Sequence, residues 1–313
     1  MLRKPAMEKV TIAIITCKRP IWLARLLDAL QEQVFSEDLT LSILVVDNAC
    51  DKETKDIVDK RRSGLIPIQY DVEEQAGIVY ARNKCVSITT SMNSDYLIFI
   101  DDDEWPKEKT WASDLVLSAK KYAADIVTSH VISVDEAGKQ NWATEILYPA
   151  PEHTKGQALR VFYTNNLLLS KHVMRKMSPC FDERFAMTGA SDYHFALKCS
   201  QAGLKCVYTD APVVEEMPSS RKDVKWFCRR GFRSGIGFTR SHMFEEPLFK
   251  AILRSLFFSL VRVMRGVVLI FKSLFGQNKG TLVDGLFRVC SGFGTFMGLF
   301  GVKHDEYKKI HGK

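Results

Sequence analysis

Apolar runs and helical periodicities alternate along the first hundred residues. Four runs rich in β-branched residues predict strands at residues 10–16, 42–47, 66–71 and 96–101. Apolar residues recur at helical spacing between them, at residues 21–33, 52–62 and 78–90. This order predicts an α/β fold with a mostly parallel, Rossmann-like sheet flanked by helices. Ligands of such sheets bind outside the carboxyl ends of the strands, so polar residues at those ends are the first functional candidates.

Shorter elements are predicted beyond residue 124. The expected elements are a strand at 125–134, a loop-rich segment at 135–160, a strand at 158–170, a turn at 181–188, a helix at 191–202 and a strand at 205–208. No internal repeat or low-complexity segment interrupts them. Residues 1–218 are therefore interpreted as one catalytic domain.

Residues 247–275 have a helical pattern with two unlike sides. Its cations fall within roughly 120° of one another at 100° per residue; they are Lys250, Arg254, Arg262, Arg265 and Lys272. The opposite side holds Ile252, Leu253, Leu256, Leu260, Val263, Val267, Ile270 and Phe271. This composition is typical of a helix in the headgroup region of anionic lipid. Packing on the catalytic domain, or a contact in a homodimer, is the alternative.

No span across the membrane is predicted. The longest uncharged run near the end, residues 289–302, has fourteen residues, fewer than the roughly 20 that a spanning helix requires. Charge also separates this part from the rest, because residues 219–313 hold 18 Lys and Arg against 6 Asp and Glu, and residues 1–218 hold 26 against 31. The chain is thus divided into the domain at 1–218, a basic segment at 219–246 and an amphipathic, membrane-associating region at 247–313.

The basic balance also fits a nucleic-acid-binding protein. The apolar side of the C-terminal helix argues against that hypothesis, because nucleic-acid binders seldom expose Leu and Phe opposite their cations. An anionic membrane surface is favoured, and no nucleic-acid partner is expected.

Eight cysteines are scattered along the chain without a C-x-x-C pair or a histidine at zinc-ligand spacing. We expect reduced, mostly buried thiols in a cytosolic protein. The apolar run that follows Arg3 and Lys4 is too short for a secretory signal. The predicted location is cytoplasmic and peripheral, on the inner face of the cell membrane.

The strongest chemical signal follows the strand at 96–101, where Asp101, Asp102, Asp103 and Glu104 are consecutive. Four adjacent anions repel one another, and a divalent cation relieves that repulsion. Mg²⁺ or Mn²⁺ held by one or two carboxylates commonly presents a substrate's phosphates. The alternative is a solvated acidic turn that caps the next helix, whose start Pro106 favours.

Two further strand ends hold candidate ligand contacts. Asp47 ends the second strand, where it can accept hydrogen bonds from a base or a ribose, or cap the helix that starts near Lys52. Gly77 allows the backbone to approach a ligand closely. Arg82 offers a cation on the first turns of the following helix, although a single arginine is usually a surface residue.

Together these segments resemble the family 2 glycosyltransferases, which have the GT-A type fold. The resemblance rests, in the same order along the chain, on residues 12–20, 45–48, 77–83, 101–103, 181–185 and 189–192. The closer similarity is to bacterial transferases that build exopolysaccharide or lipopolysaccharide, including succinoglycan-type enzymes with a similar Asp-Asp-Asp-Glu run.

The resemblance implies a nucleotide-sugar donor, for which a UDP-sugar is the first expectation, a saccharide or lipid-linked acceptor, and Mn²⁺ or Mg²⁺. By this resemblance the donor is contacted by Thr16, Arg19, Asp47, Gly77, Arg82, Asp101 and Asp102, the metal by Asp103 and Asp101, and the catalytic base is Asp192. A single displacement by an acceptor hydroxyl inverts the anomeric configuration and needs no covalent nucleophile. The Q-x-x-R-W motif of processive synthases is missing, which favours addition of a single sugar.

The chain departs from the family pattern beside the base. The usual Glu-Asp pair is Ser191-Asp192, and the acidic residue often found two positions later is His194. We expect His194 on the helix surface, whereas Ser191 is the one feature that supports an inactive scaffold. Residues 215–231 resemble a family segment that closes over the donor. A nucleotidyltransferase is disfavoured because no glycine-rich phosphate loop follows the first strand.

Overall fold

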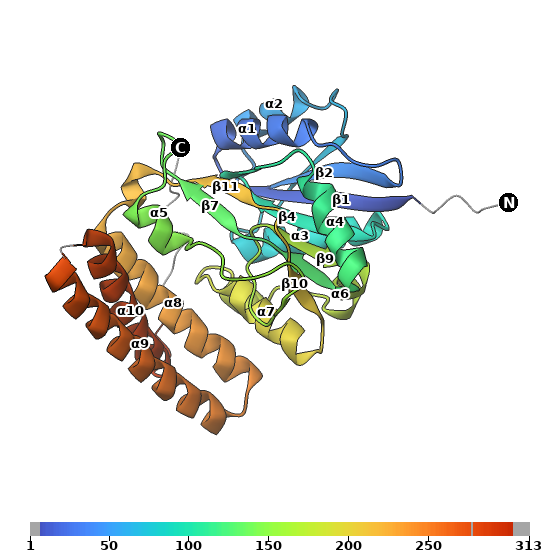
Figure 1. The fold of residues 1–313 in the computed structure, drawn as a ribbon. Coiled ribbons are helices and arrows are strands. Elements are labelled where there is room, and N and C mark those ends of the chain that lie inside the picture. The colour runs from blue at the N-terminus through green and yellow to red at the C-terminus, as the bar shows by residue number, and fades with distance from the viewer. Residues whose placement is uncertain (1–6, 277, 303–313) are drawn as a thin grey trace.

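An eight-stranded sheet forms the centre of the protein in a computed structural model that describes residues 7–276 and 278–302 (Figure 1). Its strand order is β3-β2-β1-β4-β9-β6-β10-β8. The strands are β1 (Glu8–Thr16), β2 (Leu39–Asp47), β3 (Ile68–Val72), β4 (Tyr96–Asp101), β6 (Ile126–Thr128), β8 (Ala158–Leu159), β9 (Leu167–Ser170) and β10 (Cys206–Tyr208). The first four are parallel, and β9 runs antiparallel to both β4 and β6. The predicted α/β fold is confirmed.

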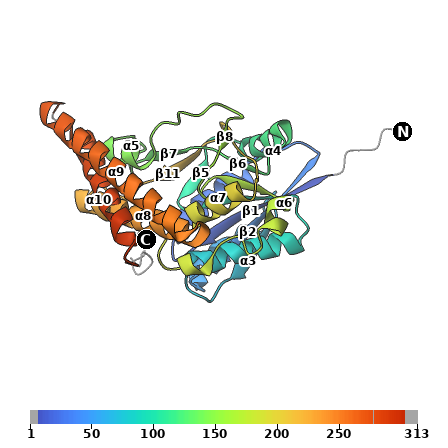
Figure 2. The ribbon, with the colours of Figure 1, turned by 90° about the horizontal axis from the view of Figure 1, so that it is seen from below.

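Helices cover both faces of this sheet (Figure 2). One face packs on α1 (Pro20–Gln31), α2 (Lys52–Asp59) and α4 (Trp111–Tyr122), and the other on α3 (Ile78–Ser91), α6 (Lys171–Lys176) and α7 (Ser191–Gln201). Alternation along β1 explains the two layers, because Ile12 and Ile14 point to the first face and Ala13 to the second. Each fully buried leucine of α1, such as Leu23, contributes roughly 1.5–3 kcal/mol of burial free energy.

A second sheet of three strands changes the prediction for residues 125–134. The expected single strand is wrong, since β6 joins the large sheet whereas β7 (Val131–Val134) joins the order β5-β11-β7 with β5 (Glu104–Pro106) and β11 (Val213–Glu216). The chain crosses between the sheets at Ser129 and His130. Two consecutive apolar runs therefore lie in different sheets. Their similar composition gives no sign that they separate.

Two other predicted segments also divide. The expected strand at 158–170 consists of β8 and β9, with residues 160–166 between them outside any strand. The segment expected to be loop-rich contains α5 (Trp142–Leu147), which starts with a capping box in which the Asn141 side chain accepts from the backbone of Ala143 and Thr144. The η1 turn (Glu183–Phe185) lies within the turn predicted at 181–188.

Three long helices form a layer beside this α/β unit (Figures 1 and 2). They are α8 (Val224–Glu245), α9 (Leu248–Gly276) and α10 (Lys279–Gly298), and α10 packs extensively on both others. The backbones approach closely at glycines: a Cβ on Gly235 would lie 2.1 Å from the carbonyl oxygen of Ser291, and one on Gly294 would lie 1.9 Å from that of Phe232. Within the described ranges, no helix is both long and apolar enough to cross a membrane.

The predicted helix at 247–275 is confirmed, with one correction to its basic side. Arg262 is turned inward, where Nη1 donates to Thr295 Oγ1 at 2.6 Å and the guanidinium lies 4.4 Å from the ring centroid of Phe238. The apolar side is shared between two environments, because Val263 and Ile270 pack on α10 while other residues face outward. The eight cysteines are free thiols in the structure, and four of them are buried, fewer than the expected majority.

Candidate functional site

The register of the central strands brings three polar residues to one edge of the sheet. Thr16 pairs with Asp47 across β1 and β2, and Ile15 pairs with Asp101 across β1 and β4. The predicted common placement of Thr16, Asp47 and Asp101 is confirmed. This is the edge at which open α/β sheets bind their ligands.

Asp47 is fully buried and organises the loop after β2. Its Oδ1 accepts from the backbone nitrogen of Ala49 at 2.8 Å, and its Oδ2 accepts from that of Asp51 at 2.7 Å and from the Tyr70 hydroxyl at 2.9 Å. Burial and this carboxylate raise the pKa of Tyr70. The alternative that Asp47 caps α2 is wrong, because Asp51 accepts from the backbone nitrogen of Thr54. Asp47 therefore shapes the rim of the site.

Asn48 joins that loop to the start of α3. Its Nδ2 donates to the carbonyl oxygens of Glu73 and Gln75, both at 2.8 Å, and its Oδ1 accepts from the backbone nitrogen of Gly77 at 3.0 Å. Gly77 has φ +135°, and a Cβ there would lie 3.1 Å from the Cβ of Ala186. The close approach at Gly77 is thus to another part of the chain, and its contact with a donor stays a prediction.

Asp102 acts as a structural carboxylate within the acidic run. Its Oδ2 accepts from Thr16 Oγ1 at 2.8 Å, and its Oδ1 accepts from Arg19 Nη1 at 2.7 Å. The same nitrogen lies 3.4 Å from Asp103 Oδ2. Burial lowers the pKa of Arg19, but these two carboxylates together raise it above its usual value. Both oxygens of Asp102 are thus occupied by contacts that join β1, the start of α1 and the end of β4.

The other carboxyl groups of the site crowd one another. Burial and then Asp103 raise the pKa of Asp101 to about 7, and the same two causes raise that of Glu215 to about 7. Burial, followed by Asp101, also raises the pKa of Glu104. The alternative of a solvated acidic turn is wrong, because Asp102, Asp103 and Glu104 are all at most 6% exposed. The cluster is short of positive charge.

Arg221 partly compensates this charge from the segment after β11. Its Nη1 lies 3.1 Å from Glu215 Oε1, and its Nη2 lies 3.9 Å from Asp103 Oδ2. Among the described residues, the buried Oε2 of Glu215 has no hydrogen-bond partner. An arginine from the predicted closing segment therefore reaches the acidic cluster.

Arg82 is buried, unlike the usual surface arginine, and connects the cluster to α7. Its Nη1 donates to Ser191 Oγ at 2.8 Å, and its guanidinium lies 5.5 Å from the ring centroid of Phe181. Its charge also opposes the upward shift in the pKa of Asp101. Ser191 thus takes an arginine hydrogen bond at the position where the family pattern has a carboxylate.

Asp192 follows in the first turn of α7 and is half-buried. Its Oδ1 accepts from the backbone nitrogen of Tyr193 at 2.8 Å. The chain enters the helix through Gly189 and Ala190, both with positive φ. A Cβ on Gly237 of α8 would lie 2.4 Å from the Cβ of Ala190, so α8 fixes this turn at close range.

His194 is the clearest error of the sequence prediction for the site. It is fully buried and not on the helix surface; its Nε2 lies 2.7 Å from Glu245 Oε1, and its ring stacks on Phe185 at 4.6 Å. Burial lowers the pKa of His194, with Glu245 acting in the opposite direction. One residue earlier, the Tyr193 hydroxyl lies 3.0 Å from His242 Nε2. Two contacts thus attach the helix of Asp192 to α8.

The partners of Glu104 were not predicted from the sequence. Asn165 Nδ2 donates to Glu104 Oε1 at 3.2 Å and to the Tyr148 hydroxyl at 3.1 Å. Asn166, its neighbour, accepts at Oδ1 from the indole nitrogen of Trp111 at 2.9 Å. Two consecutive amides inside an otherwise apolar run were the available signal, because a buried amide needs partners.

The acidic run contains ligands suited to a hard divalent cation. Within the described part of the chain, the Asp101 side chain has no short hydrogen bond or ion pair, and Asp103 has only contacts at 3.4 and 3.9 Å to arginines. No three His, Cys, Asp or Glu side chains of that part converge as a closed metal site. One or two carboxylates with the remaining positions open are what a phosphate-bridging Mg²⁺ or Mn²⁺ requires.

The sequence matches a known family over the segment that builds this edge. Residues 11–178, more than half of the chain, match the family described as glycosyl transferase family 2. The chain belongs to this family. The family assignment of this glycosyltransferase indicates that it acts in glycosyl transfer. A comparison with curated proteins finds no match.

Solved structures share the fold of this glycosyltransferase at low sequence identity. The mannosyltransferase PcManGT from Pyrobaculum calidifontis, in complex with GDP-Man and Mn²⁺, is 15% identical, with a TM-score of 0.64 over 94% of this chain and 91% of that chain. S. aureus TarS 1-349 in complex with UDP is 13% identical, with a TM-score of 0.54 over 97% and 95%. A further S. aureus TarS structure is 14% identical, with a TM-score of 0.53 over 75% of this chain and only 43% of that one. The predicted GT-A type fold is confirmed, whereas the succinoglycan-type relationship stays a prediction.

Proposed function

We propose that this enzyme transfers one sugar, with inversion, to a hydroxyl of a saccharide or lipid-linked acceptor in cell-surface polysaccharide biosynthesis. The observation that carries the proposal is the contact between Arg82 and Ser191, at 2.8 Å. It joins the first turn of α7, where Asp192 lies, to α3, and the charge of Arg82 also acts on Asp101 at the edge of the sheet. This link supports the proposal that the base Asp192 and the cation-binding pair Asp101 and Asp103 serve one site.

Within this proposal the three aspartates have different roles. Asp103 and Asp101 would hold Mn²⁺ or Mg²⁺, and a bound cation supplies neutralisation of the charge that grows on the diphosphate leaving group. Asp102 holds Thr16 and Arg19 in place, so its contribution to donor binding is to fix the shape of the pocket. Residues 219–246 close over the donor, since Arg221 already reaches the cluster.

The nucleoside is assigned to the rim made by β1 and β2. Thr16, Asp47 and Gly77 surround the strand ends there, and Tyr70 offers a hydroxyl bound to Asp47. A UDP-sugar is the proposed donor. Among the similar structures one contains UDP and another GDP-Man, so the base must be decided by measurement.

Asp192 is proposed as the general base that accepts the acceptor hydroxyl's proton during attack. Its Oδ1 is held by the Tyr193 backbone nitrogen. The attacking oxygen forms the new bond to the anomeric carbon as the diphosphate leaves with the bonding electron pair, and the proton goes to Asp192.

The proposed location is the cytoplasmic face of the cell membrane, where the C-terminal region 247–313 would associate peripherally with anionic lipid. A membrane-proximal acceptor is supported by the outward apolar side of α9. A homodimer through the same helices is the competing arrangement.

Calorimetric titration of UDP, GDP, dTDP and CDP, each with Mn²⁺ and again with excess chelator, tests the donor site. Metal-dependent binding of one nucleotide is expected, and no binding of any would instead favour the inactive scaffold. Asp192→Asn tests the base, because the variant should bind the nucleotide as the wild type does while losing transfer. Retained transfer would remove Asp192 from its role.

A further inference from the structure

The outer side of α9 is an exposed apolar surface along the whole helix. Its large exposed side chains are Leu248, Phe249, Leu253, Leu256, Phe257, Leu260, Met264, Val267, Val268, Phe271, Leu274 and Phe275. Phe249 is 73% exposed and Phe275 is 82% exposed. We call these twelve residues the α9 outer face. An exposed surface of this size marks an interaction site in a folded protein.

The inner side of α9 combines small residues with larger side chains that pack on α8 and α10. Its buried positions are Ala251, Ser255, Gly266 and Ser273, while Val263 and Ile270 contact α10 and the ring centroid of Phe258 lies 5.2 Å from that of Phe238 on α8. At Gly266 a Cβ would lie 2.6 Å from the carbonyl oxygen of Gly285 on α10. The small residues let the backbones of α9 and α10 approach closely, and the large side chains of the α9 outer face stay exposed on the other side of the helix.

Cations border this face along one side. Lys250, Arg254, Arg265 and Lys272 fall within roughly 60° of one another at 100° per residue, next to the apolar arc. Arg265 and Lys272 are exposed, whereas Arg254 lies 3.0 Å from Glu246 and Lys250 lies 4.0 Å from it. Long cationic side chains at the edge of an apolar face reach lipid phosphates while their stems stay in the apolar layer.

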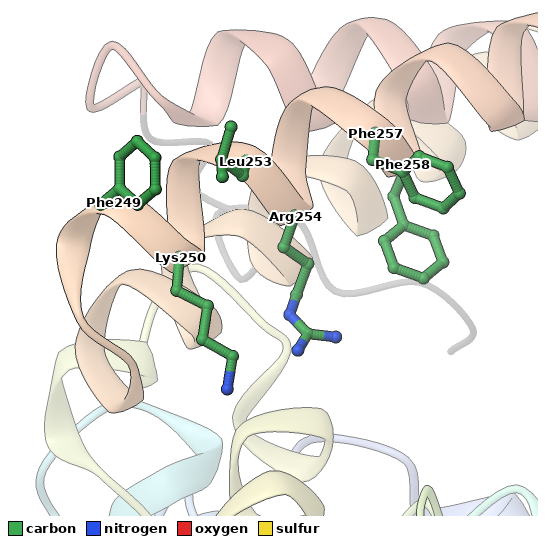
Figure 3. A pocket seen from close by; sticks show the side chains of 6 residues that line it. All are labelled: Phe249, Lys250, Leu253, Arg254, Phe257 and Phe258. Carbon is green, nitrogen blue, oxygen red and sulfur yellow. The ribbon is translucent and has the colours of Figure 1, made fainter.

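A hollow of about 430 Å³ lies where the two kinds of side chain meet (Figure 3). Its lining consists of Phe249, Lys250, Leu253, Arg254, Phe257 and Phe258. Figure 3 shows the lysine and the arginine projecting from the same stretch of α9 as the aromatic rings. Aromatic and aliphatic side chains thus lie next to two cations on one side of α9, and both cations also lie beside Glu246.

We propose that the α9 outer face is the membrane-docking surface of this enzyme and lies in the boundary between headgroups and acyl chains of an anionic bilayer. The helix would lie parallel to the membrane, because its apolar face extends over all 29 residues, a length of about 43 Å. This inference deepens the proposed function and rests on its statement that the acceptor is presented at a membrane.

The charge pattern favours lipid over a second copy of this chain. In a two-fold contact through the α9 outer face, Arg265 and Lys272 of both copies, which have no acidic partner among the described residues, would be brought together, whereas Lys250 and Arg254 lie beside Glu246. An anionic bilayer provides the charge that complements Arg265 and Lys272.

Flotation with vesicles of phosphatidylglycerol and phosphatidylcholine, compared with phosphatidylcholine alone, tests the surface. The full chain should float with the anionic vesicles and bind the neutral ones at least ten-fold more weakly. Phe257→Asp combined with Leu260→Asp should abolish flotation, while the matched exposed change Leu117→Asp on α4 should not. Arg265→Gln and Lys272→Gln should each weaken anionic binding about five-fold.

Three results would overturn the proposal. The first is a wild-type chain that binds neither vesicle, and the second is a double aspartate variant that binds as the wild type does. The third is light scattering that gives a dimer in the absence of lipid and a monomer for the double variant. Nucleotide titration of the same preparations reports separately on the proposed function, so loss of lipid binding with retained nucleotide binding concerns the docking surface alone.

Discussion

His194 on α7 and Glu245 at the end of α8 form a buried contact of 2.7 Å between Nε2 and Oε1. His194 follows the proposed base Asp192 by two residues. Beside this contact is a second one, in which the Tyr193 hydroxyl lies 3.0 Å from His242 Nε2. The C-terminal helices are therefore attached to the catalytic edge through polar contacts as well as through glycine packing. A change at either contact should affect the position of α7.

His194→Ala should lower the free energy of unfolding by about 2–4 kcal/mol, because it leaves Glu245 without its partner and a cavity beside Phe185. Urea denaturation measures this effect. The matched change His172→Ala alters an exposed histidine and should stay within about 0.5 kcal/mol of the wild type. Equal effects of the two substitutions would contradict the structural role of His194.

Asp102 and Asp101 should respond oppositely to replacement by asparagine. Asp102→Asn breaks the buried ion pair with Arg19 and should cost about 2–3 kcal/mol. Asp101→Asn relieves repulsion within the cluster, so we expect unchanged or higher stability, with metal-dependent nucleotide binding at least ten-fold weaker. Thermal unfolding of the two variants checks the stability changes, and calorimetry checks nucleotide binding. Similar losses of stability in both variants would contradict a structural role for Asp102 that Asp101 does not share.

The acidic cluster should make the metal-free enzyme less stable as the pH rises. The pKa of Glu215 is raised to about 7, mainly by burial, whereas a carboxyl group in the unfolded chain titrates near 4. The folded state therefore holds a proton that the unfolded state has lost, and this stabilisation is complete below about pH 4 and is lost as the pH rises through about 7.

Glu215→Gln isolates this contribution. Relative to the wild type, the variant should gain stability between pH 5 and pH 8, by on the order of 2 kcal/mol. The measurement is the difference in melting temperature at each pH in the presence of chelator. A melting-temperature difference between variant and wild type that does not change with pH would contradict the raised pKa of Glu215.

Gly235→Ala tests the close packing of α8 on α10. The added Cβ would lie 2.1 Å from the carbonyl oxygen of Ser291, so the backbones must separate, and we expect a loss of about 3 kcal/mol. Gly276→Ala is the control, because a Cβ at the end of α9 meets nothing within 4 Å. Circular dichroism during thermal unfolding measures both, and equal melting temperatures would argue against the tight contact.

Much of the fold could be predicted because it depends on local pattern. The strands that end at Thr16, Asp47 and Asp101 are apolar runs next to polar residues, and their parallel order follows from the helices between them. The same is true of α9, whose periodicity fixes its helical form and its two sides. Division of residues 125–134 between two sheets could not be predicted, because both halves are equally apolar.

The sequence by itself determined that carboxylates follow a buried strand at Asp101, Asp102 and Asp103. Only the tertiary structure decided that Asp102 is the one occupied by Thr16 and Arg19, because these contacts join residues more than 80 positions apart. Likewise it decided that His194 is buried, since Glu245 comes from a distant helix. Side-chain partners depend on which surfaces meet in the folded chain, whereas strands and helices are specified by the spacing of apolar residues along it.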